Sequence, residues 1–150
     1  MTVRHLRALA LDLGSRRVGV AVGDDRSGLA FPRDALERAP SSAGGRAEDH
    51  RRVAALVAEE EVDVVVVGLP RSMDGGLGPA ARAALDEVEE LRAALPVPVE
   101  VHDERLTTVA ADRALAGAGV PGRRRRSSID SAAAAVLLTS WLATDAGGGS

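Results

Sequence analysis

Larger apolar residues alternate with small or polar ones over residues 8–24, with a period of two. Such alternation predicts β-strands that have one strongly apolar face. The segment divides into two strands, because Gly14-Ser15-Arg16-Arg17 has the composition of a tight turn. The first strand places Leu9, Leu11 and Leu13 on one face, opposite Ala8, Ala10 and Asp12. The second places Val18, Val20 and Val22 on one face, opposite Gly19, Ala21 and Gly23.

The rest of the chain alternates between extended and helical patterns. Residues 29–31, followed by Pro32, predict a third, antiparallel strand at a sheet edge, where proline is tolerated. The valine-rich run at 62–69 is typical of a parallel strand that is covered on both faces. The other predicted elements are a helix over about 47–60, a helix from the glycine-rich loop 71–78 to about 95, a strand from 96 through 101, a helix from Thr107 or Thr108 to about 117, a basic linker over 120–128, and a last helix over 129–143.

This order of elements predicts an α/β fold. We expect a mixed five-stranded sheet, with three antiparallel strands followed by parallel strands, and helices on both faces. At 150 residues the chain is long enough for a single domain with its own core. We expect that domain to span 1–145, followed by a flexible tail over 146–150.

Composition excludes several kinds of chemistry. The chain has no cysteine, so it offers no disulfide, thiolate ligand or catalytic thiol. One Phe, one Trp and no Tyr leave little aromatic surface for stacking bases. No signal peptide or membrane span is visible, so we expect a cytoplasmic protein without a membrane partner. The net charge of -3 argues against bulk binding of nucleic acid, but arginines cluster at 16–17 and 123–126.

Three acids stand at the ends of predicted elements. Asp12 ends the first strand, Glu104 follows the last strand, and Asp130 lies in the first predicted turn of the last helix. In open α/β sheets, active sites form where strand ends border a crevice. Carboxylate oxygens are the ligands that Mg²⁺ and Mn²⁺ prefer. Two such ions, about 3.5–4 Å apart, can support phosphoryl transfer.

Each of these residues also has a purely structural explanation. Asp12 can simply begin the turn. Asp130 follows Ser127 by three residues, as in a capping box at a helix start. Glu104 and Asp103 can pair with Arg105 at the surface, His102 can be a partly buried strand residue, and the arginine run can be a solvated loop.

The combination of these segments resembles the YqgF/RuvX family, RNase H-like proteins described as Holliday junction resolvases or pre-16S rRNA nucleases. The segments are LDLGSRRVGVAVGDD, VVVGLPRSMDGGLGP, VEVHDERLTTVAADRAL and IDSAAAAVLLTSWL. The resemblance implies an RNase H-like fold and a metal-dependent nuclease whose ligands are Asp12, Glu104 and Asp130. Asp103 is a possible substitute for Glu104. Arg71-Ser72 stands where relatives more often carry an apolar residue and Asn.

We therefore expect an enzyme that hydrolyses phosphodiester bonds and processes the 5' end of precursor 16S rRNA, with Mg²⁺ or Mn²⁺ as cofactor. A metal-bound water would be the nucleophile, so no protein nucleophile is needed. Phosphates of structured RNA would be held by arginines. The candidates are Arg16, Arg17, Arg71, Arg105, Arg123, Arg124, Arg125 and Arg126. We expect a monomer or a weak homodimer.

Three other functions remain open or are set aside. A resolvase would keep the metal chemistry and cut branched DNA as a dimer. A non-catalytic nucleic-acid-binding module on the same scaffold would lack metal binding. A sugar-kinase-like ATPase, suggested by the glycines around the first turn, needs two lobes, and 150 residues supply only one.

Overall fold

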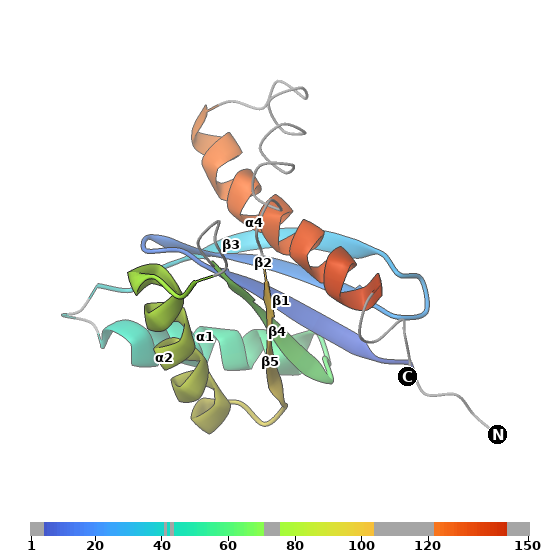
Figure 1. The fold of residues 1–150 in the computed structure, drawn as a ribbon, viewed down its shortest axis with the longest axis horizontal. Coiled ribbons are helices and arrows are strands. Elements are labelled where there is room, and N and C mark those ends of the chain that lie inside the picture. Colours follow the sequence, from blue (N-terminus) through green and yellow to red (C-terminus); the bar gives the residue numbers. More distant parts are fainter. Residues whose placement is uncertain (1–4, 41, 43, 71–75, 104–121, 144–150) are drawn as a thin grey trace.

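The computed structural model describes residues 5–40, 42, 44–70, 76–103 and 122–143, and for 122–130 it describes the backbone alone. Figure 1 shows a twisted sheet between two layers of helices. The strands are β1 (Arg7–Leu13), β2 (Arg17–Asp24), β3 (Ala30–Glu37), β4 (Val64–Leu69) and β5 (Val99–Asp103). The helices are α1 (Gly45–Glu59), α2 (Pro79–Ala94) and α4 (Gly122–Trp141).

The five strands form one sheet in the order β3-β2-β1-β4-β5. β1 pairs with β2 and β2 pairs with β3 in antiparallel fashion, whereas β4 is parallel to both β1 and β5. This arrangement confirms the predicted mixed sheet. It also makes β1 the central strand, so the carboxyl ends of β1, β4 and β5 meet at one edge of the sheet.

Each face of the sheet has its own apolar core. Leucines and valines fill the face toward α1 and α2, with Leu9, Leu11, Val20 and Val22 fully or almost fully buried. Smaller side chains fill the face toward α4, where Ala8 and Ala10 pack near Leu137 and Trp141. The faces predicted from the alternation in residues 8–24 are therefore confirmed. Small residues on the α4 face allow a long helix to lie close to the strands (Figure 1).

Two predicted boundaries are wrong. β3 runs to Glu37 instead of ending at residue 31, because its exposed, polar positions hide the strand pattern. The residues 122–128 are not a linker: they are the first two turns of α4, which begins at Gly122. Arginine is a good helix former, and four of them in a row favour a helix over a loop.

Other predictions concern residues that the structure does not describe. The helix expected near 107–117 and the tail at 146–150 lie outside the described residues. Within the described part of the chain, none of the helices is both long enough and apolar enough to cross a membrane.

Candidate functional site

Asp12 lies near the carboxyl end of β1, beside the turn to β2. It is half-buried and pairs with Gly19 of β2. The turn closes through a hydrogen bond from the N–H of Gly14 to the carbonyl of Arg17, at 2.9 Å. A Cβ at position 14 would lie 2.6 Å from that carbonyl oxygen, so the turn requires glycine there. Asp12 thus stands at the end of the central strand, one residue before a tightly closed turn.

Glycines flank Asp12 on both neighbouring strands. The parallel register pairs Leu11 with Val67, so the next position along places Asp12 beside Gly68 of β4. By alternation Asp12 shares the α4 face with Ala8 and Ala10. Because the flanking positions are Gly19 and Gly68, neither neighbour in this row of the sheet places a side chain next to the carboxylate. Space beside an acid at a strand end suits a hydrated cation or a phosphate.

His102 completes this row, because it pairs with Gly68 on the far side. Its Nε2 lies 2.9 Å from Oγ of Ser140 in α4. His102 is therefore a half-buried residue of a strand, as predicted.

Asp103, the last residue of β5, lies one position beyond the row of the sheet that contains Asp12, Gly68 and His102. It pairs with Leu69, which packs with Ala81 and Ala84 of α2. By alternation Asp103 therefore belongs to the α2 face, opposite to the face of Asp12. The two carboxylates share an edge of the sheet but not a face.

Asp130 lies in the interior of α4 and not in its first turn. The helix begins at Gly122, eight residues earlier, so the capping explanation and the predicted first-turn position are both wrong. The next residue, Ser131, is buried, and its Oγ accepts a long 3.4 Å hydrogen bond from the N–H of Val20. Val20 follows Gly19, the partner of Asp12, so α4 passes close to the Asp12 row at residue 131.

The predicted arginines fall into three groups. Arg16 is exposed in the turn, and Arg17 begins β2, where its Nε lies 3.9 Å from Oε1 of Glu37. The backbone of residues 123–126 is helical, in the first turns of α4. The remaining predicted site residues lie outside the described part of the chain: Arg71, Glu104 and Arg105.

The predicted metal site lies only partly within the described residues. Of the three predicted ligands, its side chain alone is described, and the described residues contain no group of three His, Cys, Asp or Glu side chains that could hold a metal ion. The donor is a carboxylate flanked by glycines in the sheet, and the sequence has no cysteine to supply a thiolate. That chemistry suits Mg²⁺ or Mn²⁺.

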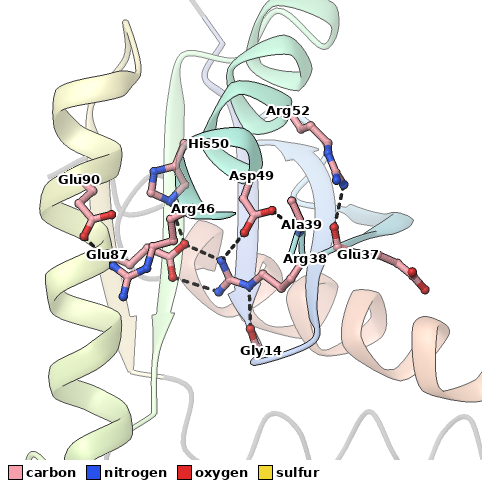
Figure 2. A network of polar contacts seen from close by, with 10 residues as sticks. All are labelled: Gly14, Glu37, Arg38, Ala39, Arg46, Asp49, His50, Arg52, Glu87 and Glu90. Atoms are coloured by element: carbon pink, nitrogen blue, oxygen red, sulfur yellow. Dashed lines mark hydrogen bonds and ion pairs between the residues drawn. The ribbon is translucent and has the colours of Figure 1, made fainter. Parts of the chain in front are cut away.

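A buried polar network that was not predicted from the sequence lies close to the turn (Figure 2). Arg38 binds Asp49 of α1 and Glu87 of α2, and Nε2 of His50 lies 2.8 Å from Oε2 of Glu87. An acid-rich run such as residues 86–90 is typical of a solvated helix face, yet Glu87 is only 5% exposed. No local pattern distinguishes Glu87 from its exposed neighbours, since its partners lie far away in the sequence.

The network shifts the ionisation of its members. Burial alone would raise the pKa of Glu87, but hydrogen bonds from Arg38 and His50, with the charge of Arg38, outweigh it and lower that pKa below its usual value. Burial alone would likewise disfavour the charged form of Arg38 and lower its pKa. The hydrogen bonds and charges of Glu87 and Asp49 prevail there, and the pKa of Arg38 is raised.

Comparison with solved structures defines the class of fold. The structure of T. thermophilus RuvC in complex with a Holliday junction substrate matches with a TM-score of 0.59 and 17% identity, over 96% of this chain and 96% of that chain. A second Thermus thermophilus RuvC structure matches with a TM-score of 0.54 and 17% identity, over 95% and 97%. The fold is therefore RNase H-like, as RuvC is.

The chain belongs to the RuvX family, whose sequence pattern, described as Holliday junction resolvase, matches residues 6–144. A relative from Mycobacterium sp. (strain KMS) is 48% identical over 138 residues, which are 91% of this chain and 79% of that protein. One from Halalkalibacterium halodurans is 39% identical over 137 residues, 91% of this chain and 96% of that protein. Both carry a name that refers to pre-16S rRNA nuclease activity. The chain is an enzyme of the nuclease class.

Proposed function

We propose that this nuclease depends on a divalent cation and trims the 5' end of precursor 16S rRNA. The observation that carries the proposal is the position of Asp12, at the end of the central strand of an RNase H-like sheet and between Gly19 and Gly68. The names of the relatives support the RNA substrate. Such a reaction takes place in the cytoplasm.

Asp12, Glu104 and Asp130 would hold Mg²⁺ or Mn²⁺. A bound cation would activate a water molecule and offset the charge that develops on the phosphate. Two findings support this set of ligands. Asp103 lies on the face opposite Asp12, which favours Glu104 over Asp103. The backbone of Asp130 adjoins Ser131, which contacts the strand next to Asp12.

The arginines would bind phosphates and set the position of the RNA without reading its sequence. Arg16 and Arg17 lie on the turn that follows Asp12, so contacts there would bring a phosphate toward the carboxylate. A second basic region would lie at the start of α4, where Arg123, Arg124, Arg125 and Arg126 are consecutive residues of a helical backbone. Arg71 and Arg105 are assigned from the sequence alone.

Hydrolysis of branched DNA is the second candidate. It rests on the description of the family pattern as a Holliday junction resolvase. A resolvase would use the same acids but would need a symmetric dimer to cut two strands in concert. We place this function second because the relatives at 48% and 39% identity are named for nuclease activity on pre-16S rRNA.

Substitution of the three acids tests the metal site. Asp12→Asn, Glu104→Gln and Asp130→Asn should each remove nearly all cleavage of a labelled precursor rRNA fragment in Mg²⁺ or Mn²⁺. Asp34→Asn, an exposed carboxylate on the edge strand β3, is the matched control and should leave cleavage unchanged. Cleavage that survives Asp12→Asn while stability falls would make Asp12 a structural turn residue.

A further inference from the structure

Arg38 holds the β1–β2 turn through its backbone and through its side chain, whose contact with Gly14 is shown in Figure 2. Its N–H donates to the carbonyl of Arg16 at 2.8 Å, and its Nε donates to the carbonyl of Gly14 at 2.9 Å. One residue therefore occupies two carbonyls of the same turn. This anchors the turn to the chain that leaves β3 at Glu37.

The other nitrogens of Arg38 reach two helices. Nη1 and Nη2 donate to Oε2 and Oε1 of Glu87 in α2, at 2.7 and 3.0 Å. Nη1 also donates to Oδ2 of Asp49 in α1, at 3.2 Å. The side chains of Arg38, Asp49 and Glu87 are 16%, 7% and 6% exposed, so water competes little for these bonds. Arg38 thus connects both helices to the turn.

Among the described residues, small side chains leave the turn with little apolar support on this side. A pocket of about 430 Å³ lies between the turn and the helices. It is bordered by Leu13 at the end of β1, by Gly14 and Ser15 of the turn, and by small side chains of α2. The α2 side chains concerned are Ala80, Ala83 and Ala84. Because these side chains are alanines, α2 offers the turn little apolar contact across the pocket. The bridge from Glu87 through Arg38 to Gly14 spans it.

We propose that Arg38 is a positioning residue for the candidate nuclease site, because it ties the turn behind Asp12 to α1 and α2. Asp12 precedes Gly14 by two residues, so a displaced turn displaces the end of β1. A metal site needs its donors held within about 0.5 Å. This inference rests on the proposed function for its consequence, but the link between Arg38 and the turn can be measured without metal.

A purely structural role is the alternative. In that case Arg38 would only neutralise Asp49 and Glu87, and its loss would harm the fold by leaving two buried charges without a partner. The two roles separate if the charges are removed together. Neutral side chains then satisfy the buried positions, while the carbonyl of Gly14 still lacks its donor.

The decisive comparison uses two variants and a control. Arg38→Met removes the guanidinium and keeps most of the side-chain volume. The triple variant Arg38→Met/Asp49→Asn/Glu87→Gln also removes both charges, and it keeps an acceptor for the N–H of Ala39 and a partner for His50. The control is Arg46→Met/Glu90→Gln, which removes an exposed ion pair of 2.6 Å between α1 and α2 that does not touch the turn.

Two readouts are needed: Mn²⁺ affinity by calorimetry, and hydrogen exchange at the amide of Gly14 with thermal melting as the reference. Arg38→Met should melt earlier, exchange faster at Gly14, and bind Mn²⁺ about tenfold more weakly, the lower end for outer-shell partners of a metal site. The triple variant should recover much of the melting temperature yet keep fast exchange and weak binding. The control should match the wild type in both readouts.

The inference is wrong if the triple variant recovers Mn²⁺ affinity and slow exchange at Gly14 along with its stability. Arg38 would then have only a structural role. Failure of the proposed function has a different signature. The wild type would then bind no Mn²⁺ and cleave no RNA, while the exchange at Gly14 would still report whether Arg38 holds the turn.

Discussion

Glu87 and Arg38 form a two-point ion pair, with hydrogen bonds of 2.7 and 3.0 Å, although 49 positions separate them in the sequence. The pair joins α2 to the segment that follows β3, and Asp49 of α1 joins it from the other side. A charged network inside a small domain costs desolvation, which close hydrogen bonds must offset. The contribution of this network to the free energy of unfolding can therefore be measured by varying the pH.

The pH dependence of stability should carry the signature of Glu87. Unfolded Glu87 takes up a proton near its ordinary pKa of 4.5, whereas the folded-state pKa is lower. Its ionised form thus stabilises the protein fully above that value, and this contribution is lost as the pH falls through the folded pKa. At neutral pH, Glu87→Gln should lower the free energy of unfolding by about 2 kcal/mol.

Denaturant unfolding at a series of pH values measures this effect. The difference between wild type and Glu87→Gln should narrow below pH 4.5, where the wild type loses the same charge. Glu90→Gln, on the exposed side of α2, should change stability by less than about 0.5 kcal/mol. A gap between Glu87→Gln and wild type that stays constant into the acid range would contradict this account.

Gly14→Ala should strain the turn directly. The added Cβ would lie 2.6 Å from the carbonyl oxygen of Arg17, and only a shift of backbone can relieve that contact. We expect a loss of about 1–3 kcal/mol in the free energy of unfolding. Ser15→Ala, an exposed change in the same turn, serves as the control and should have a small effect. Equal stability of both variants would mean that the turn adapts freely.

The basic start of α4 should contribute to binding through charge. Replacing Arg123, Arg124, Arg125 and Arg126 with Gln keeps good helix formers in the helix and removes the charges. Affinity for RNA should fall to a similar degree across sequences, and the slope of log affinity against log salt should flatten by about 0.7–0.9 for each phosphate that these arginines neutralise. Arg51→Gln on α1 is the control. An unchanged slope would make these arginines ordinary surface residues.

The protein should sediment as a monomer or as a weak dimer at micromolar concentration. In the part of the chain that the structure describes, the exposed large apolar residues are Leu29, Phe31 and Leu77, which is little for a stable dimer interface. Trp141 is buried and is therefore not available for such an interface. A tight dimer in sedimentation velocity would contradict this expectation and favour the resolvase.

Local patterns predicted the parts of the fold that depend on near neighbours. Alternation assigned Leu9 and Ala10 to opposite faces, because each face of β1 has a core of its own. The exposed strand β3 was too short in the prediction, since an edge strand with polar side chains shows little alternation. The start of α4 was not predicted, because proline and glycine beside the arginines resemble a linker.

The site was predictable in outline only. The acid at the end of the first strand follows from the sequence, but the faces of Asp12 and Asp103 depend on the strand register, which pairs Asp103 with Leu69. The Arg38 network depends on contacts between three elements. Arg38, Asp49 and Glu87 lie far apart in the sequence and share no periodic pattern. The network can therefore be recognised only in the assembled fold.

A competition between two substrates tests the central claim most directly. Purified protein is given a labelled fragment spanning the 5' end of precursor 16S rRNA and a labelled four-way DNA junction, in Mg²⁺ or Mn²⁺, with Asp12→Asn as the inactive reference. We predict metal-dependent cleavage of the RNA at least as fast as that of the junction, and none by the variant. Clear preference for the junction would contradict the RNA assignment, and cleavage of neither substrate would contradict the proposed nuclease function.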